Sequence, residues 1–200
     1  MRRIVAFDRL SADGYFSTPD GGLSWAVPDV DLDRLAADAT PGPENTILFG
    51  RRTYDMFESF WPHVVDDSPT APDPHAPHRR TPELRAMAVW INEATKIVFS
   101  RTRRDVTWRG SRLVHDVDPD AVRAMKQEPG HDMMIFGSGS IVSALTAHGL
   151  VDEYQFVVGP VILGDGRSLV NGLASPTRLE LLEARPYSSG NVMLRYAPAR

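Results

Sequence analysis

The chain has 200 residues, of which 42% are hydrophobic and 24% are charged, and its formal net charge is −4. This length and balance are typical of one compact globular domain, so we predict a single domain over residues 1–200. The chain has no cysteine, which excludes disulfides, cysteine-ligated metal centres and a thiol nucleophile. Its acidic net charge argues against nucleic acid as a partner.

Two apolar stretches are considered as a signal peptide or a membrane-spanning segment. Ile4–Phe7 is too short for the core of a signal peptide, and Tyr154–Gly164 is much shorter than the roughly 20 residues that cross a bilayer. We therefore expect a cytoplasmic protein with no membrane partner.

In chain order, apolar spacing predicts strands that alternate with helices. Strands are expected at Arg3–Phe7, Thr46–Phe49, Lys96–Phe99, Arg112–His115, Asp132–Phe136 and Glu153–Val158. Helices are expected at Asp31–Ala39, Arg51–Phe60, Glu83–Ala94, Pro119–Gln127 and Ser140–Ala147. Near the end, Arg178–Ala184 and Asn191–Tyr196 flank Ser188-Ser189-Gly190, which is typical of a hairpin. The pattern predicts an α/β domain whose mixed, mainly parallel sheet ends in a C-terminal antiparallel hairpin.

A proline-rich segment, residues 62–82, interrupts this alternation with six prolines and with His63, His75 and His78. Imidazoles bind zinc and copper, so one interpretation is a metal site. However, prolines separate these histidines, and no helix would place His75 and His78 on a common face. We therefore favour a flexible surface loop and predict no metal site.

Two strand-to-helix turns have the residues of anion-binding sites. In Gly50-Arg51-Arg52-Thr53, the glycine allows close approach to the backbone, and the following helix presents free amides. Gly137-Ser138-Gly139-Ser140-Ile141 also joins a strand to a helix, although it lacks the third glycine of the Rossmann fingerprint. Each turn alone is also explained as an ordinary connection. Two of them in one small domain favour a dinucleotide, which needs phosphate contacts at several places.

Two further segments suggest ligand contacts. In Ser100-Arg101-Thr102, a planar guanidinium could bind a 2′-phosphate and select NADPH, or the segment could be a solvated basic loop. Ser11–Tyr15 and Asp20–Trp25 are glycine-containing loops with two aromatic residues. They could cover a flat ligand, or they could be ordinary turns in which Trp25 anchors the core.

The order of these turns, together with Leu23-Ser24-Trp25, resembles the dihydrofolate reductase fold. Gly149-Leu150-Val151-Asp152-Glu153 and Gly159–Gly166 are similar to the reductase domain at the C-terminus of RibD, as is the opening Ser11-x-Asp13-Gly14. The chain looks like a stand-alone member of that family. The resemblance implies a three-layer α/β/α fold and a homodimeric, NADPH-dependent oxidoreductase.

The resemblance also implies roles for individual residues. Cofactor contacts are expected from Ala6, Gly50, Arg51, Arg52, Thr53, Ser100, Arg101, Thr102, Gly137, Ser138, Gly139, Ser140 and Ile141. The catalytic cleft is expected at Asp13, Tyr15 and Trp25. Dihydrofolate reductases place an acid on the helix after the tryptophan, and Asp33 is the candidate here. Asp29 and Asp31 lie close by, and all three acids are also explained as acids that cap the first turn of a helix.

For the substrate, the resemblance implies a flat heterocycle. The first expectation is reduction of 5-amino-6-(5-phosphoribosylamino)uracil, a step of riboflavin biosynthesis, with Arg34 as a candidate phosphate clamp. The second is dihydrofolate reduction, although no acid stands at the spacing usual in that family. A different class, a non-catalytic NADP(H)-binding module, also fits the turns.

Overall fold

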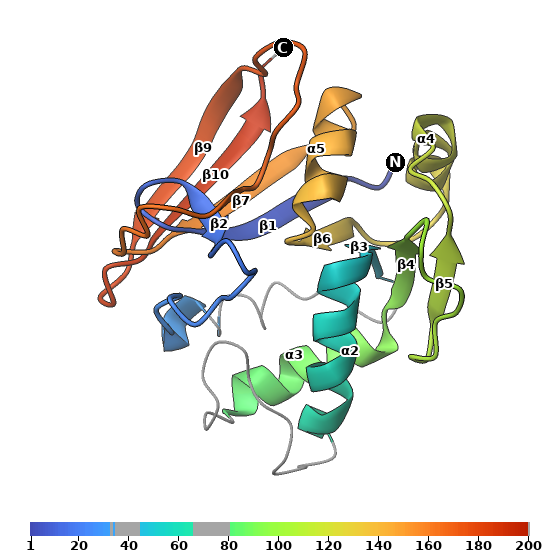
Figure 1. Cartoon of the computed structure of the whole chain (residues 1–200), viewed down its shortest axis with the longest axis horizontal. Coiled ribbons are helices and arrows are strands. Elements are labelled where there is room, and N and C mark those ends of the chain that lie inside the picture. Colours follow the sequence, from blue (N-terminus) through green and yellow to red (C-terminus); the bar gives the residue numbers. More distant parts are fainter. Residues whose placement is uncertain (33, 35–44, 66–80, 200) are drawn as a thin grey trace.

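The computed structural model describes residues 1–32, 34, 45–65 and 81–199. Its main sheet has eight strands in the order β5-β4-β3-β6-β1-β7-β10-β9. The strands of this sheet are β1 (Ile4–Leu10), β3 (Thr46–Gly50), β4 (Thr95–Phe99), β5 (Ser111–Val114), β6 (Met133–Phe136), β7 (Glu153–Val158), β9 (Leu179–Pro186) and β10 (Val192–Pro198). The first six in the spatial order run parallel, and β10 and β9 pair antiparallel, which confirms the predicted mixed sheet with its C-terminal hairpin (Figure 1).

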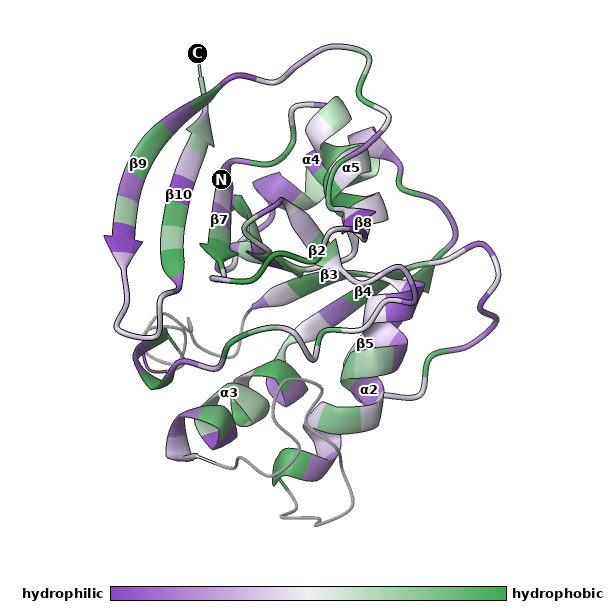
Figure 2. Ribbon diagram, turned by 60° about the vertical axis from the view of Figure 1, so that its left-hand side comes forward, coloured by the Kyte–Doolittle hydropathy of each residue, from purple (hydrophilic) through white to green (hydrophobic). Residues whose placement is uncertain are grey.

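Helices cover both faces of this sheet, which confirms the predicted three layers (Figures 1 and 2). The helices with described bounds are α2 (Arg51–Val65), α3 (Pro82–Glu93), α4 (Pro119–Gln127) and α5 (Gly139–Ala147). Residues of α2 and α3 pack with Phe49 and Val98 in one buried cluster. Val122 of α4 and Leu145 of α5 pack with Ile135 in the cluster on the other face. Each cluster removes apolar surface from water, the main favourable term in folding.

Local signals explain where two helices begin. Thr81 caps α3 by accepting a hydrogen bond from the amide of Leu84, and Pro82 follows at the first helical position. Asp118 caps α4 in the same way, ahead of Pro119. Proline suits this position because the amide it lacks would have no partner in the helix.

The proline-rich segment is shorter than predicted, because both of its ends are helical. α2 continues beyond Phe60 to Val65 and includes Pro62, and α3 starts at Pro82. Pro62 removes one helical hydrogen bond, but Trp61 and Val64 beside it are buried, which stabilises the last turn. Residues 66–80, with His75 and His78, lie outside the described residues, as does most of the helix predicted at 31–39.

Two other features differ from the prediction. β1 continues past Phe7 to Leu10, so that Asp8 lies inside a central strand. A small second sheet pairs β2 (Tyr15–Ser17) with β8 (Arg167–Ser168). Among the helices of the described residues, none has the length and apolar character needed to cross a membrane.

Candidate functional site

A cavity of about 1220 Å³ opens where β1, β3, β4 and β6 end. Its lining includes Asp8 from β1, Gly50 from β3, Phe99 from β4 and Phe136 from β6. Parallel strands end at a common edge of the sheet, which is where α/β proteins usually bind ligands. The size of the cavity suits a dinucleotide together with a small ring compound.

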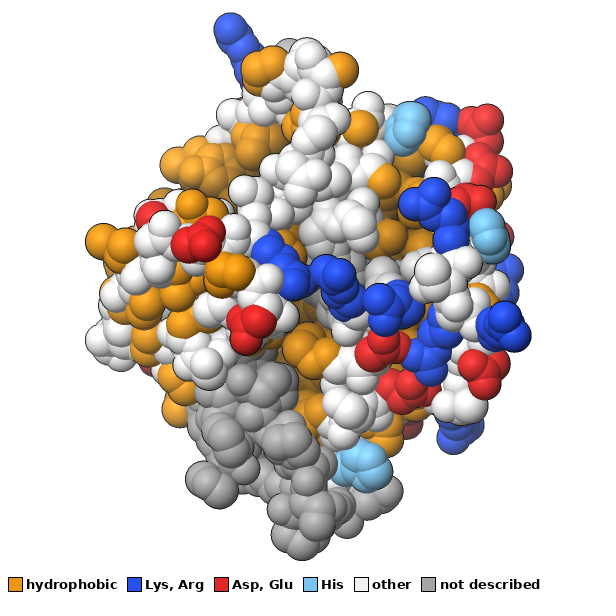
Figure 3. Space-filling model, in the orientation of Figure 1, with side chains coloured by type: hydrophobic (Ala, Val, Ile, Leu, Met, Phe, Trp, Pro, Cys, Tyr) orange, Lys and Arg blue, Asp and Glu red, His pale blue; other side chains and the backbone are white. Residues whose placement is uncertain are grey.

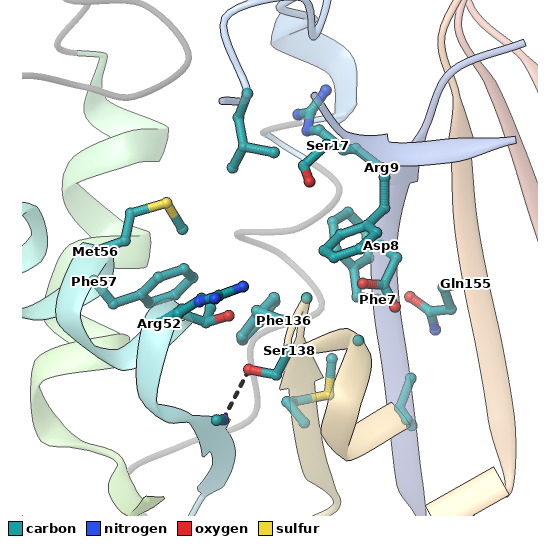
Figure 4. A pocket seen from close by; sticks show the side chains of 18 of the residues that line it. Phe7, Asp8, Arg9, Ser17, Arg52, Met56, Phe57, Phe136, Ser138 and Gln155 are labelled. Atoms are coloured by element: carbon teal, nitrogen blue, oxygen red, sulfur yellow. Dashed lines mark hydrogen bonds between the residues drawn. The ribbon is translucent and has the colours of Figure 1, made fainter. Parts of the chain in front are cut away.

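The two glycine turns meet at this edge and are joined by a hydrogen bond. The buried amide of Gly50 donates to Ser138 Oγ over 2.8 Å (Figure 4). Ser138 stands at the N-cap position of α5, but its hydroxyl makes no capping bond to that helix. The first amides of a helix have no partner inside the helix, so the start of α5 keeps its capacity to bind an anion.

Cations surround the two helix starts. Arg52 lines the cavity, and within the described residues it has no ion pair. Arg51 pairs with Asp55 over 3.1 Å, whereas the side chain of Arg101 is 78% exposed and its Nε lies 3.9 Å from the carboxylate of Asp116. A row of Lys and Arg side chains crosses the middle of the face in Figure 3. These charges add to the positive ends of the helix dipoles and favour an anionic ligand.

Aromatic rings form an apolar wall beside the turns. Phe136 lies 6.0 Å from Phe7 and 5.9 Å from Phe57, measured between ring centroids, and the pair with Phe57 is stacked. Met56 lies on the same wall in Figure 4. A wall of this kind excludes water and offers a flat surface to a planar ring.

Asp8 lies beside the same cavity, with its carboxyl oxygens closed to solvent. Its residue is 2% exposed, and neither carboxyl oxygen has a hydrogen-bond partner among the described residues. Burial raises the pKa of Asp8 to about 8. The nearby amide of Gly137 opposes this effect, although the hydrogen bond that it makes is to the carbonyl of Phe7, over 3.4 Å. A carboxyl group with this pKa is mostly protonated at neutral pH, so it repels an anion at the neighbouring turns only weakly.

The structure brings most of the predicted cofactor residues together. The cavity is lined by Gly50, Arg51, Arg52, Thr53, Ser100, Arg101, Thr102, Gly137, Ser138, Gly139 and Ser140. Two predicted contacts are elsewhere: Ala6 and Ile141 are buried in the core beneath the cavity and do not line it.

Gly137 and Gly139 differ in how much space surrounds the position that a Cβ would occupy. A Cβ on Gly139 would lie 2.8 Å from the carbonyl oxygen of Leu169, so this glycine permits close packing of the backbone. Gly137 has φ +62°, and a Cβ there would lie 3.8 Å from Thr53 Oγ1 and 4.0 Å from Asp8 Oδ1. Gly137 therefore keeps open a space between α2 and β1.

Three of the predicted catalytic residues, Asp13, Tyr15 and Trp25, lie outside the lining of the cavity. The fourth, Asp33, is outside the described residues. Asp13 accepts hydrogen bonds from Ser11 Oγ at 2.6 Å and from the amide of Gly164 at 2.7 Å. These bonds, led by that from Ser11, lower the pKa of Asp13 to about 2. Asp13 thus connects two loops as a carboxylate, which is no proton donor near neutral pH.

The other acids after Trp25 also have structural partners. Asp29 accepts from the amides of Asp31 and Leu32, at the start of a helical segment. Burial raises the pKa of Asp29, but these bonds and one from Ser189 outweigh burial and lower it. Asp31 forms an exposed ion pair with Arg34, which does not line the cavity and so is not placed as a phosphate clamp.

Sequence reasoning missed several lining residues. The prediction considered mainly the turns that follow strands. It therefore missed residues within the strands themselves, which are Phe7, Asp8, Arg9 and Gln155. The available signal was Asp8 itself, because it directly follows the apolar run Ile4–Phe7. A charged residue in a strand buried on both faces is rare unless it has a function.

The fold and the site together define a three-layer α/β protein with a nucleotide-sized cavity between two helix starts. The model of the RibD C-terminal domain family matches residues 2–193, and the chain belongs to this family of reductase-like domains.

Comparison with individual proteins agrees with this assignment. The uncharacterized protein YyaP of Bacillus subtilis (strain 168) is 28% identical over 198 residues, which cover 98% of this chain and 94% of YyaP. A putative riboflavin biosynthesis protein from Shewanella sp. PV-4 has a TM-score of 0.71 at 20% identity and 99% coverage of both chains. Dihydrofolate reductase from Enterococcus faecalis, complexed with NADP(H), has a TM-score of 0.62 at 15% identity, covering 99% of this chain and 97% of its own. Both of these solved structures therefore have the same fold as this chain.

Proposed function

We propose that this protein is an NADPH-dependent reductase that transfers a hydride to a flat heterocycle. One observation carries the proposal: one cavity joins two helix starts, an aromatic wall, a buried acid and Arg52, which has no ion pair within the described residues. The NADP(H) complex of a dihydrofolate reductase with this fold supports it.

The residues present fit NADPH. Gly50, Thr53 and residues 137–140 would hold the pyrophosphate, since the open space at Gly137 lies between the two helix starts. Arg101 and Thr102 would hold the 2′-phosphate, and Arg101 is exposed and only loosely paired. When bound, NADPH supplies the hydride. The chain's own part is to orient the rings against Phe7 and Phe136 and to exclude water.

NADPH is expected to stabilise the protein much more than NADH does. A ligand at 100 times its dissociation constant adds about 2.7 kcal/mol to the free energy of unfolding. Thermal unfolding with each cofactor measures the difference, and Arg101→Ala should reduce it. Arg104→Ala is the matched control, because Arg104 is exposed and does not line the cavity. Equal shifts with both cofactors would contradict the assignment of Arg101.

For the substrate, we propose 5-amino-6-(5-phosphoribosylamino)uracil, with dihydrofolate as the alternative. A phosphate needs a cation, and Arg185 lines the cavity, stacks on Tyr187 at 5.3 Å and has no ion pair in the described part of the chain. Dihydrofolate would need a carboxylate at the pterin, and Asp29, which is ionised, does not line the cavity.

NADPH oxidation with each substrate tests this proposal. We expect turnover of the phosphoribosyl compound and a KM about 10- to 100-fold higher in Arg185→Ala, because a hydrogen bond to a charged group contributes about 1.5–3 kcal/mol. Arg178→Ala is the control, since Arg178 is exposed and outside the cavity. Turnover of dihydrofolate alone would reverse the order of substrates. NADPH binding without any oxidation would favour the non-catalytic module.

We also propose a homodimer, as the family resemblance implies. The edge strand β9 supports it, because Leu181 and Leu182 are 53% and 50% exposed there. Exposed leucines on an unpaired edge are typical of an interaction surface. A monomeric mass in solution would contradict this proposal.

A further inference from the structure

Asp8 is an acid without a partner. It lies on β1 between β6 and β7, opposite Phe156 in the register, and both of its carboxyl oxygens are closed to solvent and unpartnered within the described residues. A buried polar group without a hydrogen bond is unfavourable, and native proteins contain few of them. An unpartnered carboxyl group beside a cavity is explained if a bound ligand supplies its missing hydrogen bonds.

The surroundings of Asp8 point to the place where that ligand would reach it. A Cβ added to Gly137 would lie within about 4 Å of both Asp8 Oδ1 and Thr53 Oγ1, so the three residues meet around one point. Asp8 belongs to the same wall as Phe7 in Figure 4. Because its oxygens are closed to solvent, the carboxyl group must turn toward the cavity to contact a ligand.

Among the described residues, the elements around Asp8 bring it no charged partner. Gly137 follows β6, Phe156 faces Asp8 from β7, and Thr53 comes from α2. Two cations lie nearby, Arg9, whose guanidinium donates to the carbonyl of Val27, and Arg52, but neither is bonded to Asp8. Burial is the first cause of the raised pKa of Asp8, and no charged side chain contributes to it. At neutral pH Asp8 therefore has one hydroxyl donor and one carbonyl acceptor.

We propose that the buried, unpartnered carboxyl group of Asp8 binds a planar amide edge of the ligand, donating to the amide oxygen and accepting from the amide N–H. This inference rests on the proposed function, in which two ligands have such an edge: the carboxamide of the nicotinamide and the ring amide of a uracil-type substrate. An ionised carboxylate would instead prefer an edge with two N–H donors. The protonation of Asp8 thus decides which edge is accepted.

Calorimetric titration of wild type, Asp8→Asn and Asp8→Leu tests the inference. The probes are NADP⁺, and 5,6-diaminouracil added to protein saturated with NADP⁺. Asparagine offers the same donor and acceptor, so Asp8→Asn should bind within about 3-fold of wild type. Asp8→Leu should bind the contacted probe about 10- to 100-fold more weakly, as expected for two lost neutral hydrogen bonds. Adenosine 2′,5′-bisphosphate, which has no nicotinamide, should bind all three proteins equally.

The two probes show whether Asp8 contacts the carboxamide of the cofactor or the ring amide of the substrate. Loss of NADP⁺ affinity in Asp8→Leu assigns the contact to the cofactor, and loss confined to diaminouracil assigns it to the substrate. Wild-type affinity should also fall above about pH 8, while that of Asp8→Asn stays level. If wild type binds NADP⁺ and Asp8→Leu binds both probes unchanged, the inference is overturned and the proposed function stands. If wild type does not bind NADP⁺, the proposed function itself fails.

Discussion

Asp8→Asn is expected to stabilise the protein increasingly as the pH rises from 4 to 8. An unfolded aspartate titrates near pH 3.9, whereas burial raises the pKa of folded Asp8 to about 8. Between these values the folded state binds the proton and the unfolded state does not. Wild-type stability therefore falls with rising pH, by about 1.4 kcal/mol per unit at most, which gives roughly 5 kcal/mol over the interval. Asparagine does not titrate and escapes this loss.

Urea unfolding of wild type and variant from pH 4 to pH 9 measures the difference. It should be smallest at pH 4, where about half of the unfolded aspartate is still protonated, and largest at pH 8 and above. Asp105→Asn is the matched control: Asp105 is exposed, and its side chain has no ion pair in the part of the chain that the structure describes. Stability curves of wild type and Asp8→Asn that run parallel over this range would show that Asp8 is not buried as a neutral acid.

Much of the fold follows from local signals in the sequence. The helix predicted at Pro119–Gln127 is found with those bounds, because proline starts it and Pro129-Gly130 follows its end. The strand Glu153–Val158 is likewise found as predicted. The helix predicted at Arg51–Phe60 is longer, because burial of Trp61 and Val64 outweighs the cost of Pro62. Contacts made far along the chain decided that helix end.

Some residues of the site could likewise be predicted from the sequence, and others could not. The turns at Gly50 and Gly137 could be predicted, since the backbone freedom and free amides that bind an anion are properties of a few consecutive residues. Phe7 could not, because it lies on a strand and comes beside Phe136 and the Gly137 turn only through the pairing of β1 with β6. Arg185 could not, because it lies on β9, the last strand of the sheet. Asp13 is predicted to be catalytic because of its motif, but its hydrogen bonds to Ser11 and Gly164 hold two loops together. A polar residue in such a motif can therefore have a structural role.

Gly137→Ala is expected to weaken NADPH binding, whereas Gly149→Ala, which has the same backbone strain, is expected to leave it unchanged. Gly137 and Gly149 have φ of +62° and +61°, so alanine costs a similar amount at each, about 1–2 kcal/mol. A Cβ at Gly149 meets nothing within 4 Å, and Gly149 does not line the cavity. At Gly137 the Cβ would enter the space between Thr53 and Asp8 without touching either closely. The two variants therefore share the backbone strain and differ in the occupied space.

The central claim is that NADPH lies between the starts of α2 and α5, and the affinity of these two variants for NADPH tests it most directly. Calorimetric titration should give Gly149→Ala the dissociation constant of wild type. Gly137→Ala should bind at least about 10-fold more weakly, a loss of about 1.4 kcal/mol or more. The same dissociation constant for both variants and wild type would contradict the claim and place the cofactor elsewhere.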